Sequence, residues 1–295
     1  MTRIILFTLT NLSVVFLLSI IFKITGINIA KHYELIILSS VFGFGGSLLS
    51  LLLSKWIALR AINGKIIIKP NNEIENWLIK TIKNQSIKAG IKTPDTVIYK
   101  NSEINAFATG PNKNNALIAV STELLNKMKL EEIEAVLAHE ISHIANGDMV
   151  TMTLLQGVVN TFVIFFSKFI AEIISNVFEF NKEESTTSKK PTIIYFILST
   201  MLELTLGILA SILTMWFSRR REFYADAGAA KIAGTEKMIS ALIRLKMSNE
   251  PIDNSSISSL CIHGKSKYLS NLFLSHPPLD VRISALNNKT YIKIL

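Results

Sequence analysis

The sequence predicts an α-helical membrane protein with about four transmembrane helices and a cytoplasmic α+β domain. Three observations lead to this fold class. Of the 295 residues, 49% are hydrophobic and only 18% are charged, whereas charged residues make up about a quarter of a typical soluble domain. The apolar residues are concentrated in long uncharged runs. The segments between these runs have the periodicities of helices and short strands.

The charge balance fits a membrane protein better than a nucleic-acid-binding protein. The formal net charge is +9, but the basic residues border the hydrophobic runs. They lack interleaved aromatic residues and any nucleic-acid-binding motif, so we expect no nucleic-acid partner. The single cysteine, Cys261, excludes an intramolecular disulfide and a metal site built from several cysteines.

Four segments are long and apolar enough to cross a bilayer core about 30 Å thick at 1.5 Å per helical residue. They are Ile4–Phe22, Leu35–Ser54, Met149–Ala171 and Ile193–Phe217. The first segment is not followed by a small-residue cleavage site, so we interpret it as a retained anchor rather than a signal peptide.

Polar residues within these spans suggest how the helices pack. Ser39, Gly43 and Ser47 are spaced four residues apart in the second span, a spacing that lets a neighbouring helix approach closely. The fourth span carries Glu203. An acid inside a span can mark a functional site, but a polar partner within the bundle, Gln156 or Asn160, is the plainer interpretation.

Basic residues beside the spans predict the orientation of the chain. Lys55 and Arg60 follow the second span, and Arg219 to Arg221 follow the fourth. Such clusters mark the cytoplasmic side of a membrane, and we interpret the three arginines as topology anchors. Both termini are then cytoplasmic, while the connections at 23–34 and 183–190 lie on the opposite side.

This orientation divides the chain into four parts. The order is two N-terminal transmembrane helices in 1–54, the first half of the cytoplasmic domain in 55–148, a transmembrane hairpin in 149–217 and the second half of the domain in 218–295.

The first cytoplasmic half has an α+β pattern. A helix is expected near Ile74–Ser86, and strands are expected at Thr96–Tyr99, Ile104–Thr109 and Ala116–Val120. The last two strands flank the turn-forming residues 110–115, which predicts a hairpin. The second half is helical in pattern as far as Gly234, and residues 249–259 are expected to form a loop.

A predicted helix ends in His139-Glu140-Ile141-Ser142-His143. Residues four apart share one face of a helix, so His139 and His143 can bind one Zn²⁺ together, and Glu140 can act on a water molecule as general base. Gly147 is a plausible stop for this helix. The plainer alternative is a surface helix whose two histidines bind no metal.

A catalytic zinc ion usually has three protein ligands. Glu222, five residues after the fourth span, is the best third candidate, and His276 is the next. Asp226 lies one helical turn after Glu222 and can accept the ring N–H of a ligating histidine. The histidine pair precedes the third span and Glu222 follows the fourth. The sequence therefore predicts one Zn²⁺ per chain, close to the membrane on the cytoplasmic side.

Taken together, these motifs resemble the HtpX family of membrane-bound zinc metalloproteases, within the gluzincins. The matching stretches are NAFATG at 105–110, HEISHIANGDMVT at 139–151, SRRREFYAD at 218–226 and SHPPL at 275–279. The resemblance implies a zincin-like protease domain on the cytoplasmic face of the bacterial inner membrane. It implies an endopeptidase in membrane-protein quality control, with zinc held by His139, His143 and Glu222 and with Glu140 as the base.

The resemblance also implies a role in substrate binding for two other parts of the chain. His276 lies in the family's His-Pro-Pro motif and either helps to hold the substrate or the oxyanion or simply packs in a loop. Asn105, Ala106 and Phe107 lie on a strand whose edge an extended substrate can join through backbone hydrogen bonds. The plainer interpretation of these three residues is an ordinary hairpin strand.

We therefore expect zinc-dependent hydrolysis of peptide bonds in protein substrates, chiefly membrane proteins, by an enzyme embedded in a lipid bilayer. An oligomer is compatible with the sequence. A CAAX-prenyl-protease-like enzyme is one alternative, but it needs more spans than four. A non-proteolytic zinc-bearing membrane scaffold is another, but such a protein has no use for Glu140.

Overall fold

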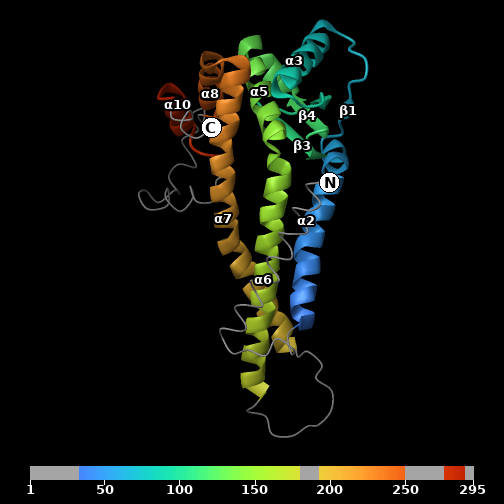
Figure 1. Cartoon of the computed structure of the whole chain (residues 1–295), viewed down its shortest axis with the longest axis vertical. Coiled ribbons are helices and arrows are strands. Elements are labelled where there is room, and N and C mark those ends of the chain that lie inside the picture. Colours follow the sequence, from blue (N-terminus) through green and yellow to red (C-terminus); the bar gives the residue numbers. More distant parts are fainter. Residues whose placement is uncertain (1–32, 180–192, 250–275, 290–295) are drawn as a thin grey trace. The chain divides into compact units, whose positions relative to one another are not determined.

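Figure 1 shows the computed structural model of the chain, which describes residues 33–179, 193–249 and 276–289. This part of the chain is mostly helical and contains one four-stranded sheet. The predicted first span Ile4–Phe22, the 183–190 connection and nearly all of the predicted loop at 249–259 lie outside the described residues.

Three of the described helices are long and apolar enough to cross a membrane. They are α2 (Tyr33–Ala61), α6 (Asp148–Glu179) and α7 (Ile193–Ala233), and they contain the three remaining predicted spans. Helix α7 does not end with its apolar run. It continues to Ala233 and is followed by Gly234, whose φ of 109° lies outside the helical region.

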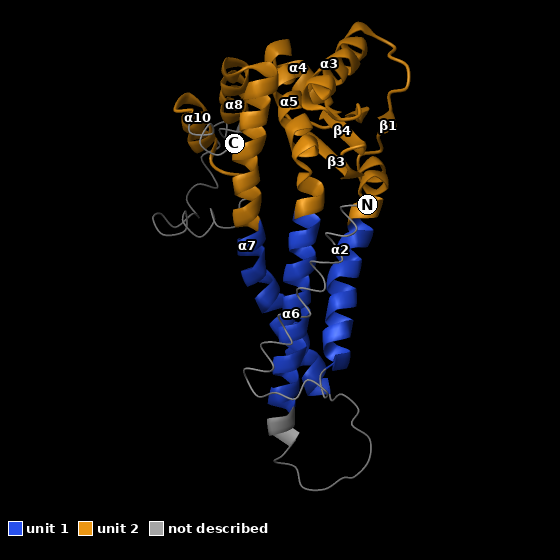
Figure 2. Ribbon diagram, in the orientation of Figure 1, with its two compact units in different colours: residues 1–50, 152–214 blue, residues 51–151, 215–295 orange. Residues whose placement is uncertain are grey.

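The chain forms two compact units, coloured separately in Figure 2. Unit 1 comprises residues 1–50 and 152–214, and unit 2 comprises residues 51–151 and 215–295. Unit 1 holds most of the apolar length of α2, α6 and α7, while unit 2 holds the sheet and the remaining helices.

In unit 1, helices α2 and α6 approach closely at Gly43. The side chains of Ser39 and Ser47 are buried on the same face as Gly43. A Cβ atom added to Gly43 would lie 2.6 Å from the backbone nitrogen of Thr161 on α6. Phe44 packs beside this contact in the apolar core of the unit. The four-residue spacing of small residues therefore does mark a close helix–helix contact.

The expected hydrogen bond between Glu203 and the amides of α6 is not made among the described residues. Gln156 instead donates a hydrogen bond to the Asn160 side chain, at 2.7 Å. Glu203 lies on an exposed face of α7, so its position on the helix directs it away from these partners.

Unit 2 is built around a sheet with the strand order β1-β2-β4-β3. The strands are β1 (Lys65–Ile66), β2 (Asp95–Tyr99), β3 (Ala106–Asn112) and β4 (Asn115–Ser121). Strand β2 runs parallel to β4, whereas β1 and β3 are antiparallel to their neighbours. The three predicted strands are confirmed, and β3 lies at one edge of the sheet.

The β3–β4 hairpin is tighter than the sequence predicts. Asn112 pairs with Asn115, so only Lys113 and Asn114 form the turn, and Gly110 and Pro111 belong to β3. The register shifts between Thr109 and Asn112. Gly110 has a φ of 144°, and a Cβ there would lie 2.7 Å from the Cα of Ala116. A glycine–proline pair that resembles a turn in sequence therefore forms an irregular strand here.

Among the described residues, five further helices belong to unit 2, namely α3 (Glu73–Ala89), α4 (Thr122–Lys127), α5 (Leu130–Asn146), α8 (Thr235–Asn249) and α10 (Leu279–Asn287). Helix α3 is capped at its N-terminus by Asn72, whose side chain accepts a hydrogen bond from the Glu75 N–H, and at its C-terminus by Gly90. Helix α5 contacts α3, α8 and β3. The central core joins these elements through Leu78, Ile82, Ile118, Val120, Leu137, Ile141 and Leu242.

We predict that Gly43→Ala destabilises the packing of α2 against α6. The added methyl group collides with Thr161 on a rigid helix, which we expect to cost about 1–3 kcal/mol. The measurement is thermal unfolding of the full chain in detergent. Gly46→Ala is the matched control, because a Cβ at Gly46 meets no atom within 4 Å. Equal unfolding temperatures for the two variants would contradict the close contact.

Candidate metal centre

Helix α5 places His139 and His143 on one face, one turn apart. The helix ends at Gly147, whose left-handed φ of 71° stops it and lets α6 begin at Asp148. The Nε2 atoms of the two histidines face each other at 3.1 Å. Both rings are largely buried, with side-chain exposures of 9% and 18%.

Helix α7 supplies the third group, Glu222. One of its carboxylate oxygens lies 3.5 Å from His139 Nε2 and the other lies 3.4 Å from His143 Nε2. These three residues form a cluster that could hold a metal ion. Zinc binds such ligands at about 2.0–2.2 Å in a tetrahedron, which separates neighbouring ligand atoms by roughly 3.3–3.5 Å. The cluster therefore has the spacing of three corners of a zinc site.

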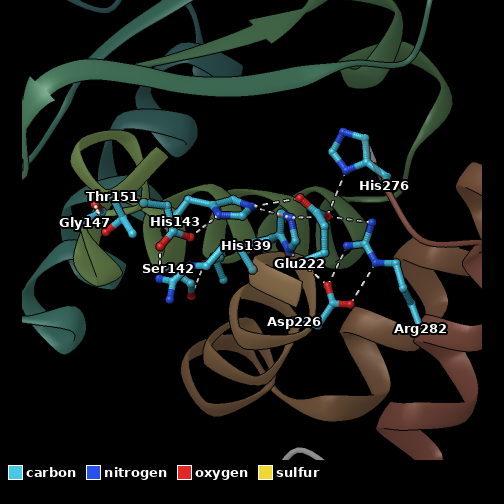
Figure 3. A network of polar contacts seen from close by, with 12 residues as sticks. His139, Ser142, His143, Gly147, Thr151, Glu222, Asp226, His276 and Arg282 are labelled. Carbon is cyan, nitrogen blue, oxygen red and sulfur yellow. Dashed lines mark hydrogen bonds and ion pairs between the residues drawn. The ribbon is translucent and has the colours of Figure 1, made fainter. Parts of the chain in front are cut away.

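Each histidine ring has a carboxylate beside its Nδ1 atom. The Nδ1 atom of His139 lies 3.0 Å from Asp226 Oδ1 (Figure 3), and the Nδ1 atom of His143 lies 2.6 Å from Asp148 Oδ2. A ring that donates its Nδ1–H to a carboxylate presents a bare lone pair at Nε2. Two such lone pairs that face each other at 3.1 Å repel unless a shared proton or a cation lies between them, so the residues present fit a metal ion.

Two arginines hold these carboxylates in turn. Arg282, on α10, donates to both oxygens of Asp226 at 2.8 and 2.6 Å, and its third nitrogen lies 3.0 Å from Glu222. Arg221, on α7, pairs with Asp148. The interpretation of Arg221 as a topology anchor is therefore incomplete, because its guanidinium pairs with this buried carboxylate of the site.

Sequence reasoning missed Asp148, Arg221 and Arg282 as parts of the site. Asp148 had one available signal, since it directly follows the helix-ending Gly147 within the motif stretch at 139–151. Arg282 is separated from the other groups by a long stretch of chain, and its only signal is its place in the helix that follows His276.

Glu140 and His276 line a cavity of about 390 Å³ beside the cluster. His276 is 62% exposed, and its Nδ1 lies 2.9 Å from Glu222. Other lining residues come from the beginning of β3, from the two residues before it and from α8, and they include Ile104, Asn105, Ala106, Met238, Leu242 and Leu245. Phe107 is not among the lining residues. Its ring packs 5.8 Å from that of Tyr99 on another face of the sheet.

Burial and neighbouring charges set the protonation of the site. Burial raises the pKa of the Glu140 carboxyl, and this effect exceeds the lowering by His139, His143 and a backbone hydrogen bond from Ala108. Burial by itself would lower the pKa of both histidines. For His139, hydrogen bonds with Asp226 and Glu222 outweigh the effect of burial and raise the pKa of the ring. For His143, a hydrogen bond with Glu222 and the nearby charge of Glu140 outweigh burial and raise the pKa in the same way.

Comparison with known proteins gives consistent matches. Residues 72–290 match the sequence profile of peptidase family M48. The chain is 57% identical over 292 residues to Protease HtpX of Buchnera aphidicola subsp. Schizaphis graminum (strain Sg). It is 55% identical over 293 residues to Protease HtpX of Pectobacterium carotovorum subsp. carotovorum (strain PC1). Both alignments cover 99% of this chain and 100% of the relative.

Among solved structures, the crystal structure of S. mikatae Ste24p is similar in fold, with a TM-score of 0.63 at 23% sequence identity. The alignment covers 91% of this chain but only 64% of that chain. Nearly all of the present fold is therefore contained within a longer protein.

The site also depends on a close approach between α5 and α7. A Cβ added to Gly228 on α7 would lie 2.8 Å from Cβ of Ser142 on α5. We predict that Gly228→Ala pushes Glu222 away from the histidines, weakens metal binding and costs about 1–3 kcal/mol of stability. The measurements are zinc content after dialysis and thermal unfolding.

Gly207→Ala is the matched control for Gly228→Ala, because it adds the same methyl group to α7 where no atom lies within 4 Å. If the Gly228→Ala variant retains zinc and unfolds like this control, the close approach is not needed for the site.

Proposed function

The chain belongs to peptidase family M48, and within it to the HtpX proteases, and on this premise we propose that it hydrolyses misfolded or damaged membrane proteins at a zinc ion held by His139, His143 and Glu222. The enzyme is a zinc metalloprotease of the membrane. The observation that carries the ligand assignment is the triangle of two imidazole nitrogens and a carboxylate, with sides of 3.1 to 3.5 Å.

When bound, zinc supplies a Lewis acid that polarises the scissile carbonyl and makes a water molecule acidic near neutral pH. We assign the proton transfers to Glu140, which follows the first ligand and faces the cavity. Its carboxylate takes the proton from the attacking water and then delivers it to the leaving amine. Burial favours this exchange, because it raises the pKa of Glu140 towards the working pH.

Strand β3 offers a place for the substrate backbone. It is an edge strand, and its first residue, Ala106, lines the cavity together with the preceding Asn105. Ala108 directs a backbone hydrogen bond to Glu140, which supports an orientation of the free edge towards the reacting groups. An extended segment that pairs with this edge is held by its backbone. Binding of this kind tolerates many sequences, as cleavage of unfolded proteins requires.

We assign His276 to the substrate side of the site. It lies in the cavity wall, it is exposed, and its Nδ1 is within hydrogen-bond distance of Glu222. From there its ring can donate a hydrogen bond to the oxygen on which negative charge develops during attack. Phe107 has a different part in this proposal. It supports β3 from the apolar face of the sheet.

We further propose that the enzyme lies in the bacterial inner membrane with its protease unit and both termini in the cytoplasm. The support is the basic residues at the ends of the apolar runs, Lys55 and Arg60 in α2 and Arg219 to Arg221 in α7. Because the enzyme lies in this membrane, we expect its substrates to be chiefly proteins of the same membrane.

We predict that Glu140→Gln retains zinc but reduces cleavage by about 10²–10⁴-fold, the usual contribution of a general base. His139→Ala, His143→Ala and Glu222→Ala should instead lose zinc. The measurements are metal content and cleavage of casein and of an unfolded membrane protein. Cleavage by Glu140→Gln at the wild-type rate would remove the base assignment, and full zinc retention by Glu222→Ala would redirect the ligand search to His276.

The same assay separates the proposed activity from the alternatives. Cleavage of unprenylated casein distinguishes the enzyme from a CAAX-prenyl-protease-like one, which would act only on prenylated peptides. Zinc binding without any cleavage by the wild-type chain would instead favour the membrane scaffold.

Orientation can be tested by cysteine labelling, because Cys261 is the only cysteine. In a Cys261→Ser background, we predict that Ser188→Cys is labelled by a membrane-impermeant maleimide in spheroplasts. Lys92→Cys, at an exposed position of unit 2, should react only after lysis. The reverse pattern would overturn the cytoplasmic placement of the protease unit.

A further inference from the structure

The ion pair between Asp148 and Arg221 stands behind His143, on the side away from the cavity. Asp148 is the first residue of α6, and its side chain is only 7% exposed. One carboxylate oxygen lies 2.6 Å from His143 Nδ1, and the other pairs with the Arg221 guanidinium. The carboxylate is thus held at both oxygens, once by the imidazole and once by the arginine.

This arrangement fixes the imidazole more firmly than a lone carboxylate would. A buried carboxylate without a cation is costly, and removal of its partner leaves an uncompensated charge. Arg221 supplies the compensation and also sets the rotation of the carboxylate. The His143 ring then keeps its Nδ1–H directed at Asp148 and its Nε2 directed at Glu222, which lies 3.4 Å away.

Arg221 and Glu222 are consecutive residues of α7, so this helix reaches His143 from two sides. Glu222 approaches the Nε2 side of the ring directly, while Arg221 acts on the Nδ1 side through Asp148. The arginine behind His139 is arranged differently, because Arg282 comes from α10. Only the His143 side ties the beginning of α6 to the helix that carries the carboxylate of the cluster.

We propose that Asp148 and Arg221 are positioning residues that couple the zinc affinity of the site to the register between the beginning of α6 and helix α7. The inference rests on the proposed function, since it takes His143 and Glu222 as zinc ligands. A shift of α7 along α6 withdraws Arg221 from Asp148 and Glu222 from His143 together. The site therefore loses zinc when this pairing is broken, even though neither Asp148 nor Arg221 touches the metal.

The test measures zinc dissociation constants of the purified full chain by chelator competition. Asp148→Asn and Arg221→Gln should each weaken zinc binding by about 10–100-fold, as is usual when the partner of a ligating histidine is lost. The double variant should lose no more than either single variant, because the two side chains act as one unit. Arg221→Lys, which keeps the charge, should restore part of the affinity.

Arg220→Gln is the matched control, because it removes the same charge from the adjacent residue of α7. Arg220 is exposed, and its guanidinium lies over the ring of Trp216 at 4.9 Å instead of in the site. Its zinc affinity should stay within twofold of the wild type. The absorption spectrum of the Co²⁺-substituted protein gives a second readout, which should change in Asp148→Asn and remain unchanged in Arg220→Gln.

The outcomes separate the inference from the proposed function. If Arg221→Gln and Asp148→Asn bind zinc like Arg220→Gln, the positioning role is wrong while the ligand assignment stands. The role is equally wrong if additive losses appear in the double variant, or if all the site variants, Arg221→Lys included, fail to fold. If the wild type binds zinc no more tightly than a His143→Ala variant, the ligand assignment itself fails.

Discussion

The functional part of this structure depends on one constraint, that two imidazole Nε2 atoms and a carboxylate from another helix must meet at a single point. His139 and His143 satisfy their share locally, because a spacing of four residues on α5 brings them to one face. Because their Nε2 atoms are 3.1 Å apart, the carboxylate from the other helix has to lie close to both of them. The contacts of α5 with α7 follow from this demand. Gly228, whose missing side chain lets α7 lie against Ser142, is the clearest example.

The core of unit 2 explains why α5 can carry polar groups at its centre. The apolar face of this helix packs into the main core through Leu137 and Ile141, so burial of that face fixes the rotation of the helix. His139 and Glu140 are then forced towards the cavity and α7. The desolvation of the two histidines is offset by carboxylates from α6 and α7, and Arg282 on α10 pairs in turn with Asp226 and Glu222.

The sequence predicts those parts of the site that local periodicity determines. The His139–His143 helix and the apolar runs follow from spacing and hydropathy, and Asp226 follows from its place one turn after Glu222. Arg282 could not be predicted, because periodicity tells which face of a helix is apolar but not which distant helix packs against it. The prediction that Gly110 and Pro111 lie in a turn was wrong for a related reason, since the pairing of β3 with β4 overrides their local preference for a turn.

Charge balance supplies a reason why this fold needs a divalent cation. The carboxylates of Glu140, Asp148, Glu222 and Asp226 are all buried around the two histidines, and they are accompanied by two guanidinium groups, that of the buried Arg282 and that of the partly exposed Arg221. With neutral imidazoles, negative charges exceed positive ones by two within this cluster, and burying such an excess is costly. Protonated histidines can offset it in the absence of metal, which is the direction in which their pKa values are displaced. Zinc offsets the same charge while binding at Nε2, so the charge balance that organises this cluster also favours its occupation by a doubly charged ion.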